Sequence, residues 1–167
     1  YTLIRKQKDL PATQMEIESM KKIVLKMADE YLLKSATNAF STVMGQSIRD
    51  FNWGGNANAA NQGILLIYAF MLTKENKYLD GALSNMDYLL GRNATGFSFV
   101  TGIGSKTPMH PHHRPSEADG ITEPVPGLLV GGPNPGMQDK CDYPFKEAEL
   151  AYIDDVCSYA SNEIAIN

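Results

Sequence analysis

Three stretches of the chain repeat apolar residues at helical spacing. In residues 14–33 they recur every three or four positions, which places them on one face of an amphipathic helix. Residues 58–73 are apolar nearly all round in their second half, a pattern typical of an inner-layer helix buried on several sides. After the polar break Lys74–Lys77, helical spacing resumes from Tyr78 to Leu90, and Gly91 supplies a stop. The sequence therefore predicts one amphipathic helix followed by a helical hairpin.

The texture changes after Gly91. Of the 23 Gly and Pro residues in the chain, 17 fall between Gly91 and Pro144, where helix and regular strand are both disfavoured. Helical spacing returns weakly over residues 147–160. Long irregular connections inside compact domains tend to be functional when they are ordered, so we expect the functional residues in this Gly/Pro-rich stretch.

Composition narrows the class of protein. The chain has 15 Lys and Arg against 19 Asp and Glu, a net charge of −4, and no basic run. It therefore lacks the positively charged surface that binding to nucleic acid or an anionic membrane requires. The longest apolar stretch, Gly63–Leu72, is far shorter than the roughly 20 residues that span a bilayer. The start at Tyr1 lacks the pattern of a signal peptide. We therefore expect a single globular domain over residues 1–167.

All three histidines lie within four residues. His110, His112 and His113 are followed by Arg114, and prolines on both sides restrict the backbone. Arg and His donors suit a hydroxylated or anionic ligand, although a solvated loop with incidental histidines is an equally good interpretation of the composition. Zinc ligation ranks third, because regular ligand spacing is absent.

Carboxylates gather near the C-terminal end, and most of them suit a solvated helix surface. Glu163 differs because Ile164, Ala165 and Ile166 follow it, and an apolar setting would raise its pKa toward that of a general acid. A surface Glu near a helix start is the plainer interpretation of the spacing alone.

Two long runs carry a family resemblance. Residues 98–114 read SFVTGIGSKTPMHPHHR and resemble the active-site histidine signature of glycoside hydrolase family 9, a cellulase family, at every specified position. Residues 152–165 read YIDDVCSYASNEIA and are similar to the acidic signature of the same family. Two segments upstream of the histidine signature, FNWGGN at 51–56 and YLLGRN at 88–93, also resemble the family. The resemblance covers most of the chain, with both signatures in the family's order.

The resemblance implies an all-α fold, about half of an (α/α)6 barrel with a long Gly/Pro-rich active-site loop. It implies hydrolysis of β-1,4-glucans with inversion of the anomeric configuration. Glu163 would be the general acid, and Asp154 would support the site or bind substrate. His112 and Arg114 would contact sugar near the cleavage point. Trp53 would stack on a sugar ring, although a single Trp more often packs in a core.

The chain departs from the family in one respect that bears on chemistry. An inverting hydrolase needs a second carboxylate as the base, and in the family that base lies in an Asp-Ala-Gly-Asp-type motif far upstream of the histidines. No such motif occurs here, because the D-x-x-D spacing from Asp139 to Asp142 lies downstream of them. We therefore expect the C-terminal portion of a catalytic module, inactive without an upstream partner half.

Two rival functions fit the same residues. One rival is a catalytically silent carbohydrate-binding half-barrel, and another is a zinc-binding domain that uses His110, His112, Cys141 and Cys157. Because secreted polysaccharidases work in oxidising settings, the resemblance implies secretion and a disulfide between the two cysteines. No cofactor is indicated, and calcium binding is left open. The Asn93-Ala-Thr95 sequon permits N-glycosylation in a eukaryotic secretory pathway.

Overall fold

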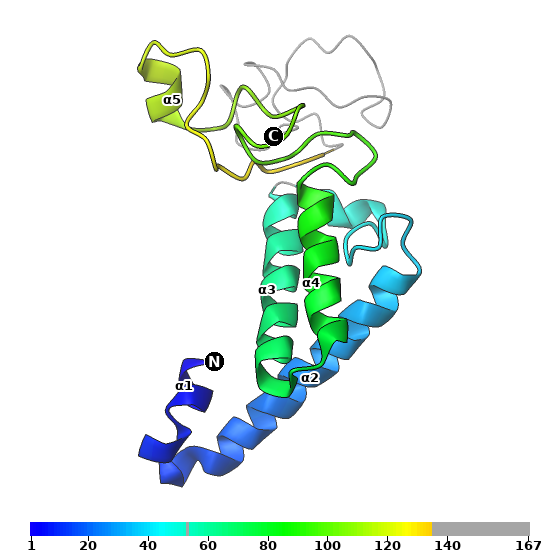
Figure 1. The fold of residues 1–167 in the computed structure, drawn as a ribbon, viewed down its shortest axis with the longest axis vertical. Helices are drawn as coiled ribbons and strands as arrows, with labels where there is room; N and C mark the ends of the chain where they lie inside the picture. Colours follow the sequence, from blue (N-terminus) through cyan, green and yellow to red (C-terminus); the bar gives the residue numbers. More distant parts are fainter. Residues whose placement is uncertain (53, 135–167) are drawn as a thin grey trace.

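The computed structural model describes residues 1–52 and 54–134. Three long helices, α2, α3 and α4, stand together, and an irregular segment with the short helix α5 lies across one end of them (Figure 1). The described residues contain no strand, and Val100 and Leu129 form an isolated antiparallel bridge. The elements in chain order are α1 Thr2–Arg5, the 3₁₀ helices η1 Gln7–Asp9 and η2 Pro11–Thr13, α2 Gln14–Ala36, the 3₁₀ helix η3 Ile48–Asp50, α3 Gly55–Thr73, α4 Asn76–Leu89 and α5 Arg114–Ala118.

The predicted helical hairpin is confirmed. A two-residue link joins α3 to α4, and it begins at Lys74, whose φ of 64° lies in the left-handed region. The Lys74 N–H donates to the carbonyl of Phe70 at 2.7 Å, which ends α3. A chain reversal this tight places the two helices side by side along their length (Figure 1).

Gly91 ends α4, as its position predicts. Its N–H donates to the carbonyl of Tyr88 at 3.4 Å, and the N–H of Arg92 donates to the carbonyl of Asp87 at 2.8 Å. These two bonds form a Schellman motif, which requires a left-handed residue at Gly91, and its φ is 121°. The chain therefore turns sharply from the helix into the Gly/Pro-rich segment.

Small residues let the three helices approach closely. One buried cluster lies between them and consists of Ala28, Leu66, Ala69, Tyr78 and Ala82. A second cluster joins the helices to the irregular segment and consists of Met44, Ala59, Tyr88, Leu89, Phe99 and Val130. The second cluster matters for function, because it fixes the Gly/Pro-rich segment on the helix ends.

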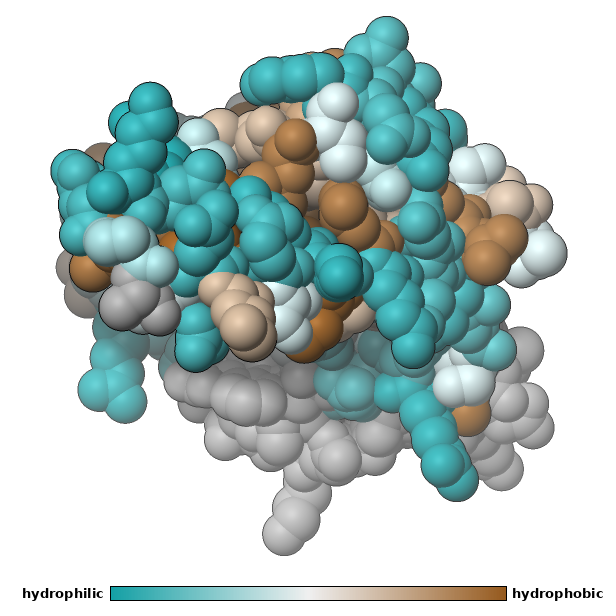
Figure 2. Space-filling view, turned by 90° about the horizontal axis from the view of Figure 1, so that it is seen from below, coloured by the Kyte–Doolittle hydropathy of each residue, from teal (hydrophilic) through white to brown (hydrophobic). Residues whose placement is uncertain are grey.

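One side of α3 is less buried than the sequence predicts. Leu66 and Ala69 are buried against the neighbouring helices, but Ile64, Tyr68 and Met71 are 48%, 39% and 36% exposed. Within the described residues α2 and α4 cover one side of α3, while Tyr1 stacks on Tyr68 with ring centroids 5.6 Å apart. Figure 2 shows exposed hydrophobic side chains between hydrophilic ones on the face seen from below.

No described helix is long and apolar enough to cross a membrane.

Candidate functional site

The Gly/Pro-rich segment is anchored on two helix ends. Phe99 donates its N–H to the carbonyl of Leu89, the last residue of α4, at 2.7 Å. Asn56, in the first turn of α3, donates its backbone N–H to the carbonyl of Gly131 and its Nδ2 to that of Val130, both at 3.0 Å. Residues 99 and 130–131 are therefore held against the hairpin.

Thr101 holds two parts of the segment together. Its N–H donates to the carbonyl of Leu128 at 3.0 Å, and its carbonyl accepts from the N–H of Gly127 at 2.8 Å. Its Oγ1 donates to the carbonyl of Val125 at 2.7 Å and accepts from the N–H of Leu128 at 2.9 Å. Thr101 is fully buried, so every polar group it carries is paired inside the segment.

The three histidines have different surroundings. His113 is the N-cap of α5, and its Nδ1 accepts the N–H of Ser116 at 3.4 Å and lies 2.9 Å from the Ser116 Oγ. That Oγ also accepts the N–H of Val125 at 2.9 Å, so its proton is available to Nδ1. These contacts assign the Nε2-protonated tautomer to His113. His113 thus has a structural role, which the histidine cluster alone did not reveal.

His112 and Arg114 lie on either side of His113 and are both exposed. The N–H of His113 donates to the carbonyl of Pro111 at 2.6 Å, so His112 occupies the tip of a γ-turn. Pro108 and Pro111 are buried, and His110 is half-buried. The His112 and Arg114 side chains are thus exposed at and just after this turn.

Five other predicted residues lie outside the described residues. Trp53, Asp154 and Glu163 belong to this group, as do Cys141 and Cys157 with their predicted disulfide. The described residues hold no group of three or more His, Cys, Asp or Glu side chains suited to a metal ion. Because two ligands of the zinc alternative are the cysteines, that alternative stays a prediction.

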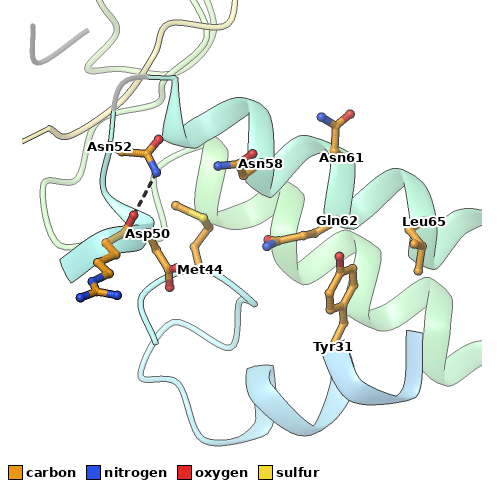
Figure 3. A pocket seen from close by; sticks show the side chains of 9 residues that line it. Tyr31, Met44, Asp50, Asn52, Asn58, Asn61, Gln62 and Leu65 are labelled. Carbon is orange, nitrogen blue, oxygen red and sulfur yellow. Dashed lines mark hydrogen bonds between the residues drawn. The ribbon is translucent and has the colours of Figure 1, made fainter. Parts of the chain in front are cut away.

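A polar pocket of about 300 Å³ lies between α2, η3 and α3 (Figure 3). Tyr31 of α2 points toward α3, and the side-chain amide of Gln62 of α3 points toward Met44 (Figure 3). The Gln62 Oε1 is buried and has no hydrogen-bond partner in the part of the chain that the structure describes. The pocket is lined by Tyr31, Met44, Arg49, Asp50, Asn52, Asn58, Asn61, Gln62 and Leu65.

The part of the pocket lining that the structure describes holds one carboxylate. This carboxylate belongs to Asp50, whose Oδ2 accepts the backbone N–H groups of Gln46 at 2.8 Å and Ser47 at 3.3 Å. The Asn52 Nδ2 donates to the carbonyl of Arg49 at 2.9 Å. Glycoside hydrolysis by the acid/base mechanism uses a pair of carboxylates, of which the described lining supplies one. Sequence reasoning missed the pocket, although three amides in the first half of α3 were a signal.

The family comparison agrees with the two signatures. The model of the family described as glycosyl hydrolase family 9 matches residues 2–167. A xyloglucan-specific endo-beta-1,4-glucanase of Bacteroides ovatus is 50% identical over 151 residues, which cover 90% of this chain and 26% of that protein. Endoglucanase D of Acetivibrio thermocellus is 36% identical over 151 residues, which cover 90% of this chain and 22% of that protein.

Solved structures agree with the fold. A Bacteroides ovatus GH9 structure is similar with a TM-score of 0.77 and 45% identity, over 93% of this chain and 27% of that one. A single-mutant thermostable endoglucanase from Alicyclobacillus acidocaldarius is similar with a TM-score of 0.72 and 33% identity, over 89% of this chain and 28% of that one. These neighbours are (α/α)6 barrel enzymes, so the predicted all-α fold class is confirmed. The chain spans about a quarter of the length of these relatives.

Proposed function

Because the chain belongs to glycosyl hydrolase family 9, we propose that it is part of a catalytic module that hydrolyses internal β-1,4-glucosidic bonds. The observation that carries this proposal is the pair of signatures within a chain that matches the family over residues 2–167. The names of the similar endoglucanases support the same substrate class.

His112 and Arg114 are proposed to contact the sugar next to the cleaved bond. Both side chains are exposed at one end of the helices, and a turn and a helix cap fix the backbone around them. Arg donors in a fixed fork, together with a His that donates or accepts, match vicinal sugar hydroxyls. Binding by groups held in place beforehand costs less conformational entropy than binding by a mobile loop.

The carboxylates are assigned from the acidic signature. Glu163 is proposed as the general acid that protonates the leaving oxygen, and Asp154 as a residue that supports the site or binds substrate. Trp53 is proposed to stack on a sugar ring. Inversion requires a base on the opposite face of the ring, and we propose that an upstream half of the module supplies it. The chain by itself is then expected to be inactive.

The remaining features of the proposal concern partners and location. The substrate is a β-1,4-glucan, and the polypeptide partner is the upstream half of the module. We propose secretion, no nucleic-acid or membrane partner, and no cofactor, with calcium binding to be measured directly.

A complementation experiment tests the proposed function. The 167-residue chain is assayed alone and fused behind the complementary part of the Bacteroides ovatus relative, on carboxymethylcellulose, mixed-linkage glucan and xyloglucan. We expect turnover only in the fusion, with the product released as the inverted anomer by NMR. Glu163→Gln should strongly lower turnover of glucan, while Glu117→Gln, a change at an exposed position of α5, should not.

The outcomes of this experiment separate the alternatives. Turnover by the chain alone that is lost in Glu163→Gln would mean that a base lies among its own residues. A folded fusion that binds cellulose without turnover would favour the silent carbohydrate-binding half-barrel. Stoichiometric zinc in the purified chain, with no glucan binding, would favour the zinc-binding domain.

A further inference from the structure

Asn56 and Gly132 fit together more closely than any side chain at position 132 would allow. Gly132 has a φ of 88°, and a side-chain carbon added to it would overlap the amide group of Asn56. The Asn56 side chain is 1% exposed, and its Nδ2 donates to the carbonyl of Val130. Glycine at 132 therefore lets the backbone of residues 130–132 lie directly on the first turn of α3.

The buried amide of Asn56 is only half paired. Its Oδ1 is buried and has no hydrogen-bond partner among residues 1–52 and 54–134. Asn85 of α4 is equally buried, but its Oδ1 accepts from Thr42 and Val43 and its Nδ2 donates to the carbonyl of Ala59. An unpaired buried oxygen destabilises a fold, and within the described residues Asn56 carries this cost while Asn85 does not.

Hydrogen bonds joined by short backbone segments lead from Asn56 to the turn that carries His112. The Asn56 side chain donates to the carbonyl of Val130, and the N–H of Val130 donates to the carbonyl of Phe99. Two residues after Phe99 in the chain, the Thr101 hydroxyl donates to the carbonyl of Val125. The N–H of Val125 then donates to Ser116, and Ser116 contacts the Nδ1 of His113. His113 lies between His112 and Arg114 in the chain.

We propose that Asn56 and Gly132 are positioning residues, which set where His112 and Arg114 stand relative to α3 and thereby the affinity of the site for glucan. The inference rests on the proposed function, because it assigns these two side chains to sugar binding. Asn56 itself touches no substrate in this proposal. It acts through the backbone of residues 130–131 and the bonds that follow.

The first test uses the ligand-free 167-residue chain and NMR. Asn56→Asp keeps the shape of the side chain, but its carboxylate cannot donate to the carbonyl of Val130, whereas the protonated carboxyl can. We expect the resonances of His112 and Arg114 to differ from those of the wild type at high pH and to coincide with them again on acidification. Burial should place the midpoint above the ordinary value of about 3.9 for Asp.

Matched variants separate positioning from general destabilisation. Gly132→Ala should shift the same resonances at every pH, because the added methyl group forces the two segments apart. Asn85→Asp changes an equally buried side-chain amide, whose oxygen accepts hydrogen bonds from residues 42–43 instead of contacting the Gly/Pro-rich segment. It should leave the His112 and Arg114 resonances in place even where it lowers stability.

The second test measures kinetics in the complemented module described above. We expect Asn56→Asp at neutral or higher pH to lower kcat/KM on glucan by about 10- to 100-fold, the size of effect that a small misplacement of binding groups produces. Most of the loss should appear in KM. Unchanged resonances in both Asn56→Asp and Gly132→Ala, or unchanged KM despite shifted resonances, would overturn the inference. If the wild-type module hydrolyses no glucan, the proposed function fails, and the NMR arm still decides whether the two residues position the turn.

Discussion

Asn93 joins the end of α4 to the segment that follows it through both ends of its side-chain amide. Its Nδ2 donates to the carbonyls of Tyr88 and Phe97, each at 2.8 Å. Its Oδ1 accepts the N–H groups of Thr95 and Gly96, both at 3.0 Å, and the Thr95 hydroxyl at 2.7 Å. Both amide hydrogens are thus in use, so a glycan at this sequon would displace one of these bonds.

We expect Asn93→Ala to lower the free energy of unfolding by about 1 to 3 kcal/mol, because it leaves several backbone groups at the end of α4 without their partner. Urea denaturation followed by circular dichroism measures the difference. Asn76→Ala, at an exposed residue in the first turn of α4, is the control and should cost much less. Equal effects of the two changes would show that the five bonds of Asn93 contribute no special stability.

Glu163 is the residue on which the proposed chemistry depends most. In the complemented module, Glu163→Gln keeps the shape but removes the transferable proton, so hydrolysis of glucan should fall by roughly 10²- to 10⁴-fold. An aryl cellobioside with a very acidic phenol needs less protonation of its leaving group and should lose much less. Substrate binding should survive. Equal losses on both substrates would remove Glu163 from the acid role.

At the scale of elements, α4 contributes a buried tyrosine to the cluster under the irregular segment. Burial raises the pKa of Tyr88 to about 12, because the anion is poorly solvated there. The pKa of Tyr78, in the same helix, is also raised by burial. In the unfolded state a tyrosine hydroxyl ionises near pH 10. Between about pH 10 and 12 the folded state therefore holds more protons than the unfolded state, and the free energy of unfolding falls as pH rises.

We therefore expect the wild type to lose about 2 to 3 kcal/mol of stability from Tyr88 across this range. Tyr88→Phe removes the ionisable group and should flatten the decline, leaving the smaller part due to Tyr78. Denaturant midpoints at pH 7, 9, 10 and 11 measure the slope, and the pH 7 values correct for any change that is independent of pH. An unaltered slope in the variant would contradict the burial of this hydroxyl.

The helices were predictable because their signals are local. Apolar spacing identified α2, α3 and α4, and Gly91 marked the end of α4 correctly because a Schellman turn needs a left-handed residue there. The start of α3 was placed three residues late, since its polar first turn shows no apolar repeat. The role of His113 as a helix cap was also missed, because Ser116 and Val125 meet it only after the segment folds back.

The contact between Asn56 and Gly132 could not be predicted from the sequence. It joins residues 76 positions apart (132 − 56), and it depends on the backbone path between them. The pocket beside η3 is similar, because α2, η3 and α3 each supply part of its lining. Local patterns indicate elements, whereas sites assembled from distant residues need the tertiary arrangement. The family signatures predicted the family and the all-α fold class correctly, because they reflect a tertiary arrangement that local spacing does not show.

At the scale of the whole molecule, an apolar stripe on α3 is open to solvent in the 167-residue chain. Ile64, Tyr68 and Met71 follow one another at helical spacing and are all more than a third exposed. Contiguous exposed apolar surface usually marks a contact with other protein. In the proposed module this stripe would face the rest of the barrel.

We expect Ile64→Gln to reduce concentration-dependent self-association of the isolated chain, measured by sedimentation velocity. In the complemented module the same change should lower the free energy of unfolding by about 1.5 to 3 kcal/mol, because an isoleucine would be buried there. Ile121→Gln is the matched control, since Ile121 is 61% exposed in the loop after α5, and it should stay within about 0.5 kcal/mol of the wild type in the module. An equal cost at both positions would mean that the stripe stays uncovered.

The two-residue link between α3 and α4 also sets the order in which the chain assembles. Contacts across this hairpin are local, so little loop-closure entropy is lost in forming them, whereas the bond from Asn56 to Val130 closes a loop of 74 residues. The hairpin should therefore fold early and the end that carries His112 last. Backbone amides of residues 99–101 and 128–130 should then exchange with deuterium sooner than those in the middle of α3. We therefore expect the part of the protein proposed to bind the sugar to unfold locally before the hairpin does.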